Sequence, residues 1–215
     1  MDTTPIRQWK FDAKDQDGVQ VGGEIEAFIK ATGLDDVASG RISRLLVLPL
    51  FGATKAGVVD PLKVVHEIRL LEEGKQSTLK PPIQNKHAPL KNLWHKHYLQ
   101  TGLSSMAMNI QTGLKRYSIP FFQQKIREAE EAGEERFVTA DDIPAIVSDA
   151  VHGNLNRLRE ESRMTGEWLI FAKYEGQNYY LTMATHDVST HQHIRQQIDG
   201  ICCWEFPFLK GILEA

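Results

Sequence analysis

The sequence lacks the features of several large protein classes. It has only two cysteines, adjacent at Cys202 and Cys203, which excludes a framework of disulfide bridges within the chain. No apolar run approaches the roughly 20 residues that span a bilayer. The N-terminal stretch MDTTPIRQWKFDAKDQDG is acidic and polar and contains no apolar signal core. These absences predict a cytoplasmic protein with reduced thiols and without a membrane partner.

The chain also lacks an excess of charge of one sign. Its formal net charge is −3, so no overall basic field would attract nucleic acid to the whole surface. A partner such as RNA would therefore need a local basic patch. Hydrophobic residues make up 41% of the 215 positions, which is ordinary for a globular protein and predicts a packed core.

Alternation of apolar and polar residues predicts a β-rich region over residues 1–80. The pattern is clearest at residues 6–30, on both sides of a polar turn, and at residues 63–75. Three prolines within residues 77–91 predict an exposed connection. We interpret residues 81–215 as an α+β region that forms either a second domain or one continuous domain with the first.

The C-terminal half mixes helical and strand patterns. Helices are predicted from about residue 93, at 120–133 and at 142–164, the last with an apolar stripe behind a capping-box-like start. Residues 167–173 and 178–184 alternate on either side of a short turn, which predicts a β-hairpin. The predicted fold class is therefore α+β, with an antiparallel sheet that includes a C-terminal hairpin and is packed with several helices.

Histidines are concentrated in KHAPLKNLWHKHYLQ, residues 86–100. Imidazole exchanges protons near neutral pH, and the lysines of this stretch favour anionic ligands. Two residues spaced i, i+2 point about 200° apart on a helix, so His95 and His97 converge only if the backbone there is extended. The alternative is that these residues are solvated or capping side chains at the start of a helix.

A second group of histidines lies in THDVSTHQH, directly after the second strand of the hairpin, where a strand end can hold side chains rigidly. The H-x-H pairs at 95/97 and 191/193 offer imidazole ligands, but no HExxH or CxxC spacing accompanies them. We therefore expect neither a metal nor a cofactor. The alternative is a short helix that Ser189 or Thr190 caps and that exposes His191 and His193.

Other motifs of catalysis are missing from the sequence. There is no phosphate-binding or dinucleotide-binding glycine pattern and no G-x-S-x-G elbow. The paired cysteines lie in an aromatic context, which is typical of buried thiols rather than nucleophiles.

These patterns predict a small histidine-dependent nuclease that cleaves RNA without metal, by general acid–base chemistry. Helices followed by an antiparallel sheet are similar, in fold pattern alone, to small toxin-like ribonucleases. The expected catalytic residues are His97, His95, His186 and Lys80. The expected substrate-binding residues are Lys86, His87, Trp94, Lys96, Tyr98 and Arg195, of which the aromatic ones would stack on bases.

Two other functions fit the same sequence. The mild acidity and the lack of a strong catalytic motif favour a non-enzymatic binding protein, of the inhibitor or immunity type, with a protein partner. The H-x-H pairs leave a metal-dependent hydrolase as a third reading. Convergence of His95, His97 and His186 would favour the nuclease, and separate exposed positions would favour the binding protein.

Overall fold

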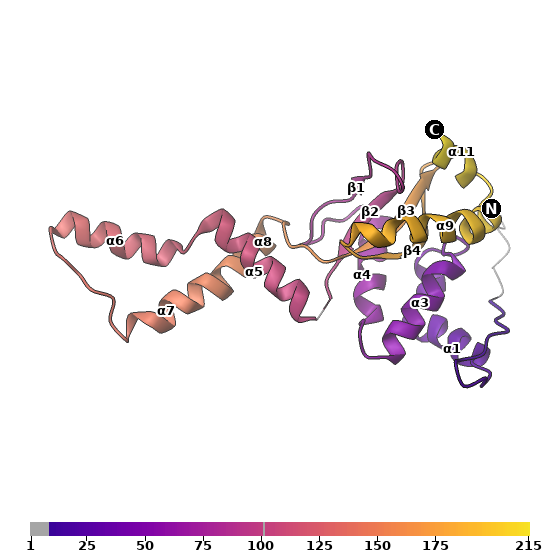
Figure 1. The fold of residues 1–215 in the computed structure, drawn as a ribbon, viewed down its shortest axis with the longest axis horizontal. Helices are drawn as coiled ribbons and strands as arrows, with labels where there is room; N and C mark the ends of the chain where they lie inside the picture. Colours follow the sequence, from indigo (N-terminus) through magenta and orange to yellow (C-terminus); the bar gives the residue numbers. More distant parts are fainter. Residues whose placement is uncertain (1–8, 101) are drawn as a thin grey trace. The chain divides into compact units, whose positions relative to one another are not determined.

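The computed structural model describes residues 9–100 and 102–215 of the chain. Within that part the chain divides into two compact units, which are described separately (Figure 1). The first unit comprises residues 9–77, 81–100 and 166–215, and the second comprises residues 78–80 and 102–165. This division differs from the predicted boundary near residue 80, because the first unit is completed only by the chain from Gly166 onward.

The N-terminal part of the first unit is helical. Its helices are α1 (Gly22–Thr32), α2 (Leu34–Val37), α3 (Arg44–Lys55) and α4 (Pro61–Glu72). The Ser43 side chain accepts a hydrogen bond from the Leu45 amide, and the Asp60 carboxylate accepts one from the Leu62 amide. Each of these side chains caps the first turn of the helix that follows it. Pro61 takes the first position of α4, where no amide proton is needed.

The prediction of a β-rich region over residues 1–80 is wrong for the described residues 9–80. The stretch 63–75, taken as a strand, belongs largely to α4, in which Val64, Val65 and Ile68 are buried. Apolar residues at these positions fit one face of a helix as well as they fit a strand, so periodicity alone does not separate the two. The capping Asp60 followed by Pro61 is the local signal that favours a helix.

The sheet of the first unit has four strands in the described residues, in the order β1-β2-β3-β4, and every neighbouring pair is antiparallel. The strands are β1 (Ile83–Gln84), β2 (Trp94–Tyr98), β3 (Glu167–Tyr174) and β4 (Gln177–Ala184). The predicted α+β fold with a C-terminal hairpin is confirmed. The hairpin turns at Glu175 and Gly176, whose φ angles of 48° and 78° suit a two-residue turn.

The helix predicted from about residue 93 is wrong over residues 94–98, which form β2. Helix α5 begins only at Leu103. The residues that pair with β2 lie at positions 83–84 on one side and 167–171 on the other. Pairing partners so distant along the chain leave no trace in the local periodicity of residues 92–100, so tertiary contacts decided this segment.

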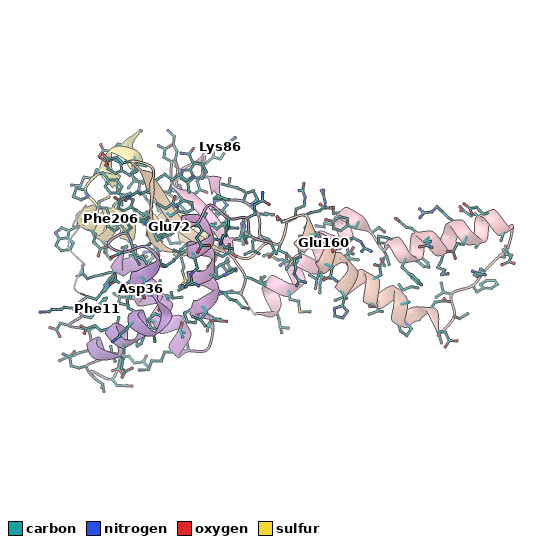
Figure 2. All side chains as sticks on the ribbon, turned by 180° about the vertical axis from the view of Figure 1, so that it is seen from behind. Phe11, Asp36, Glu72, Lys86, Glu160 and Phe206 are labelled. Atoms are coloured by element: carbon teal, nitrogen blue, oxygen red, sulfur yellow. The ribbon has the colours of Figure 1, made fainter. Side chains whose placement is uncertain are left out.

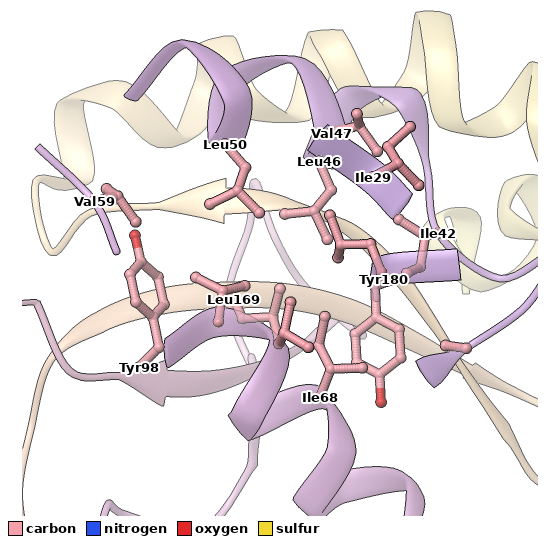
Figure 3. Close-up of a cluster of buried hydrophobic side chains, with 14 of the residues drawn as sticks. Ile29, Ile42, Leu46, Val47, Leu50, Val59, Ile68, Tyr98, Leu169 and Tyr180 are labelled. Atoms are coloured by element: carbon pink, nitrogen blue, oxygen red, sulfur yellow. The ribbon is translucent and has the colours of Figure 1, made fainter. Parts of the chain in front are cut away.

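The two faces of the sheet are covered by different segments. One face packs on α1, α3 and α4, with Phe171 among its buried side chains. Leu169 and Tyr180 of this face are labelled in Figure 3. The other face packs on the C-terminal helices α9 (His191–Gln197), α10 (Cys203–Glu205) and α11 (Leu209–Glu214) and on the π-helical turn Ile198–Cys202. Ile170 and Ala172 of β3 lie on this second face. Successive side chains of β3 thus alternate between the two faces, and both faces are buried.

Both cysteines lie in the apolar cluster between the sheet and the C-terminal helices. Cys202 and Cys203 are buried free thiols. Burial raises the pKa of the Cys202 thiol to about 12, although a contact with the Ser43 hydroxyl opposes the shift. The reading of these cysteines as structural therefore agrees with their surroundings, since a thiolate is disfavoured at neutral pH.

The second unit is built from helices. They are α5 (Leu103–Tyr117), α6 (Pro120–Ala132), α7 (Asp142–Ser148) and α8 (Asn154–Glu160), with a π-helical turn at Asp149–Gly153 between the last two. The predicted helix at 120–133 is confirmed, and Gly133 closes it at a φ of 66°. The predicted helix at 142–164 is confirmed as far as Glu160 and contains the π-helical turn. None of the described helices is long and apolar enough to cross a membrane.

Glu72 at the end of α4 ties that helix to the hairpin. Its carboxylate accepts hydrogen bonds from the Tyr180 hydroxyl at 2.7 Å and the Asn178 amide at 3.1 Å, and it forms an ion pair with Arg41. Burial alone would raise the pKa of the Glu72 carboxyl. The hydrogen bonds from Arg41, Tyr180 and Asn178 outweigh burial, and the pKa lies below its ordinary value.

Glu72→Gln should lower the free energy of unfolding at pH 7 by about 1–3 kcal/mol, because hydrogen bonds to the charged carboxylate are lost. A lowered pKa means that this contribution is present above the unfolded-state value of about 4.3 and is lost as the pH falls through the folded-state value. Urea melts across pH 2.5–7 should therefore show the difference from wild type shrinking at acid pH. The neighbouring exposed Glu73→Gln serves as control, and an equal loss there would contradict the assignment.

Candidate active site

The alternation of β2 sorts its side chains onto opposite faces of the sheet. His95 pairs with Ile170 and His97 pairs with Trp168, so both histidines face the C-terminal helices. Trp94, Lys96 and Tyr98 face α1 to α4. The extended backbone that the two histidines needed in order to converge is therefore present.

Four histidine rings surround Trp168, and we call this set the histidine cluster: His95, His97, His186 and His191. His95 stacks on the Trp168 ring with 4.1 Å between centroids, and His186 and His191 each lie 5.2 Å from it. The His97 ring lies 5.5 Å from the His95 ring and 5.5 Å from the His186 ring. Three chain segments far apart in the sequence thus meet in one place.

Hydrogen bonds to carbonyl oxygens fix which ring nitrogen carries the proton. His186 donates from Nε2 to the Gly166 carbonyl at 2.8 Å, and His191 donates from Nε2 to the Thr185 carbonyl at 3.0 Å. His95 donates from Nδ1 to the Asn85 side-chain carbonyl at 2.9 Å, and the Asn85 amide donates to the Leu93 carbonyl. A neutral imidazole with one nitrogen donating has a basic lone pair on the other. These three rings therefore hold defined tautomers.

The members of the cluster differ in their access to solvent. His186 is exposed, at the turn that follows β4, whereas His97 is only 2% exposed. His95 and His191 are also buried, and Trp168 is half-buried. Of the four rings, that of His186 is therefore the most accessible to solvent.

Gly166 carries the backbone carbonyl to which His186 donates its hydrogen bond. A Cβ atom at this position would lie 1.9 Å from the Tyr98 carbonyl oxygen, so only glycine fits against β2 here. The close approach sets the position of the Gly166 carbonyl, which accepts the His186 proton. No local sequence pattern indicates this role, because it depends on the pairing of β2 with β3.

Three of the predicted substrate-binding residues are not part of the cluster. Lys96 is buried on the opposite face, where its ammonium pairs with the Glu67 carboxylate at 3.2 Å. Burial lowers the pKa of Lys96, and the Glu67 charge opposes this. Tyr98 is also buried there, its hydroxyl 3.5 Å from Met183 Sδ, and burial raises its pKa. Trp94 packs beside Phe171 with Lys173 over its ring. Lys96 and Tyr98 are buried and therefore unavailable to a nucleic acid, whereas Trp94 is half-buried on the face opposite the cluster.

The remaining predicted site residues are distributed as follows. Lys80 belongs to the second unit, where its amide donates to the Met164 carbonyl, so the structure does not place it in the cluster. Lys86 and His87 are exposed in the loop that follows β1, and Lys86 is labelled in Figure 2. Arg195 on α9 donates to the carbonyl of Pro89 in the same loop and pairs with Asp199. Arg195 therefore tethers the loop to α9 and has a structural role.

Two cluster members could have been found from sequence. Trp168 lies in β3, the first strand of the hairpin that the alternating pattern predicts correctly. His191 was singled out in the second histidine group, but its burial against Trp168 depends on how α9 packs. His193, its H-x-H partner, is exposed, so that pair does not converge. Among residues 9–100 and 102–215, no group of three or more His, Cys, Asp or Glu side chains is placed to hold a metal ion.

Comparison with known proteins gives no further information about the site. No family model, no curated protein and no solved structure matches the chain.

The Lys96–Glu67 pair predicts a purely structural phenotype. Lys96→Ala should lower the free energy of unfolding by about 3–5 kcal/mol, because it leaves a buried carboxylate without its counter-charge. The double variant Lys96→Met with Glu67→Leu should recover most of this loss, because apolar side chains of similar volume need no pairing. Chemical melts of the three proteins measure the effect. A double variant no more stable than Lys96→Ala would contradict it.

Proposed function

We propose that the protein is a small histidine-dependent nuclease that cleaves RNA by general acid–base chemistry without a metal ion. One observation carries the proposal: His95, His97 and His186 converge on Trp168, although the sequence separates them by up to 91 positions. Imidazole groups held close together can exchange protons near neutral pH, which is what general acid–base catalysis requires.

The chemistry needs one base and one acid on the same phosphodiester. His186, the exposed ring, takes the proton of the ribose 2′-hydroxyl as its oxygen attacks phosphorus. The 5′-oxygen leaves with a proton supplied by a second imidazole, for which His97 is the nearest candidate at 5.5 Å from His186. The products are a 2′,3′-cyclic phosphate and a 5′-hydroxyl. Base and acid act in opposite protonation states, so the rate should follow a bell-shaped pH profile.

The loop that follows β1 supports binding of a polyanion. Lys86 and His87 are exposed on it. Asn85, at its start, holds His95, and Arg195 ties the carbonyl of Pro89 to α9. These contacts tether the loop to His95 and to α9. We propose that Lys86 and His87 contact phosphates, since contacts of this kind position a nucleic acid without reading its sequence. We place the substrate in the cytoplasm, where free thiols such as Cys202 persist.

Trp168 adds a second reason to expect a ligand. Its Nε1 is buried and donates to no acceptor among the described residues. A buried donor without an acceptor costs about 1–3 kcal/mol, and such groups in native proteins are enriched where a ligand or water completes the bond. A phosphate oxygen at the cluster would supply that acceptor.

His186→Ala should abolish cleavage of RNA while changing the melting temperature little, because the side chain is exposed. The assay is degradation of a defined RNA in the presence of EDTA, with end-group analysis for the cyclic phosphate and with the all-deoxy strand as a substrate that lacks the nucleophile. The matched control is His193→Ala, an exposed histidine on α9 outside the cluster, which should keep full activity.

The same assay separates the proposal from its alternatives. His97→Gln should also lose activity, although its burial predicts a lower melting temperature as well. Cleavage that persists in His186→Ala, or no cleavage of any RNA by the folded wild type, would contradict the proposal and favour a binding protein of the inhibitor or immunity type. Cleavage that EDTA abolishes would favour a metal-dependent hydrolase instead.

A further inference from the structure

Asn85 directly follows strand β1 and lies beside His95 in the sheet. Ile83 pairs with His95 across β1 and β2, and side chains that are directly opposite in a pair lie on the same face. Alternation along β1 puts the side chain of Asn85 on that face as well. Asn85 is half-buried there, and its side-chain oxygen lies 2.9 Å from His95 Nδ1. Asn85 is therefore a direct neighbour of the histidine cluster.

The other end of the Asn85 amide fixes its orientation. Its Nδ2 donates a hydrogen bond to the Leu93 carbonyl at 3.1 Å. A backbone carbonyl can only accept, so the amide nitrogen must face Leu93 and the amide oxygen must face His95. An amide oxygen also only accepts, and the donor is therefore His95 Nδ1. In the neutral ring the basic lone pair of His95 is then on Nε2.

The backbone of Asn85 closes the loop that joins β1 to β2. Its amide donates to the Leu93 carbonyl at 2.8 Å, and its carbonyl accepts from the Asn92 amide at 2.9 Å. The backbone and the side chain of Asn85 thus each use both a donor and an acceptor. A side chain held at this many points presents its oxygen to His95 in one position, which is what support of a functional group requires.

The C-terminal helices hold the same loop from outside the sheet. Asn92 donates from its side chain to the Ile212 carbonyl of α11 at 2.9 Å. Arg195 of α9 donates to the Pro89 carbonyl at 2.9 Å. These contacts fix the far end and the middle of the loop that begins at Asn85, so its position does not depend on the short strand β1 alone.

The ring that Asn85 holds contacts two other members of the site. His95 stacks on Trp168 with 4.1 Å between centroids and 17° between ring planes. It meets the His97 ring edge-on, at 5.5 Å and 78°. A rotation of the His95 ring would change both contacts. The hydrogen bond from Nδ1 therefore bears on the position of His97, although Asn85 itself contacts only His95 in this chain of contacts.

We propose that Asn85 is a positioning residue of the histidine cluster, which sets the tautomer and the ring orientation of His95. It acts through His95 and touches no reacting atom. A neutral amide suits this role, because it accepts the Nδ1 proton without favouring the charged imidazolium as a carboxylate would. The catalytic consequence rests on the proposed function, in which His97 is the acid and keeps its place beside a correctly held His95.

The tautomer of His95 tests the proposal without an assay of activity. Long-range ¹H–¹⁵N spectra at about pH 8, where an unperturbed imidazole is neutral, should show the proton on Nδ1 in the wild type. Asn85→Leu removes the acceptor and should lose this tautomer, whereas Asn85→Asp retains an oxygen and should keep it. Both variants lose the donor to Leu93, so their difference isolates the contact with His95. Gln84→Leu, on the opposite face of β1, should leave His95 unchanged.

RNA cleavage by the same proteins tests the consequence. Asn85→Leu should lower kcat by about tenfold or more with little change in KM, because a small displacement of a catalytic group is enough to cost this much. Asn85→Asp should cleave faster than Asn85→Leu, and Gln84→Leu should keep the wild-type rate. Circular dichroism checks the fold of each variant, and Asn85→Ala replaces Asn85→Leu if the latter does not fold. A merely structural role would give the Leu and Asp variants the same tautomer and the same rate.

Three results would overturn the proposal. They are an Asn85→Leu protein that keeps the Nδ1 proton of His95, an Asn85→Asp protein that loses it, and an Asn85→Leu protein that loses it yet keeps the wild-type kcat. Failure of the proposed function looks different, because the wild type itself would then cleave no RNA. In that case the spectra of the wild type and of the two Asn85 variants still decide whether Asn85 sets the tautomer of His95.

Discussion

The candidate site depends on the two-residue alternation of a single short strand. In β2 the side chains of His95 and His97 face the C-terminal helices, and those of Lys96 and Tyr98 face the N-terminal helices. A shift of register by one residue would exchange the two sets, burying the imidazoles in the apolar core and turning the lysine toward α9. The histidine cluster exists only because β3 and β1 hold β2 in its present register.

The two faces of β2 carry polar groups of different kinds. On one face Lys96 and Glu67 are paired within an otherwise apolar core, where desolvation opposes both charges and a mispaired register would leave both unmatched. We infer that this pair penalises the alternative register of β2. On the other face His95 donates to the Asn85 side-chain carbonyl and stacks on Trp168, and the nearby His186 and His191 donate to backbone carbonyls. One face thus fixes the strand, and the other presents groups that can exchange protons.

The part of the fold that the sequence predicts is the part with local signals. The hairpin of β3 and β4 was predicted because Glu175–Gly176 forms a tight turn between alternating runs, and α6 because Gly133 closes it. Most of α4 was predicted to be a strand, and β2 was predicted to be part of a helix. Val64, Val65 and Ile68 fit both periods, and β2 owes its extended form to partners that are up to 77 positions away. His95, His97 and His186 were named from sequence, and Trp168 lies in the predicted hairpin, but Asn85 and Gly166 join the site through tertiary packing alone.

We propose that His95, His97 and His186 form one cluster that a ligand can reach, in which hydrogen bonds set the tautomers of His95, His186 and His191. Long-range ¹H–¹⁵N correlation spectra of the histidine rings test it most directly, recorded with and without a non-cleavable 2′-O-methyl RNA. We predict a proton on Nε2 of His186 and His191 and on Nδ1 of His95. The ring signals of His186 and His97 should shift when the RNA is added, and those of His193 should stay unchanged. Ring signals of His186 and His97 that do not respond to saturating RNA, or tautomers opposite to these, would contradict it.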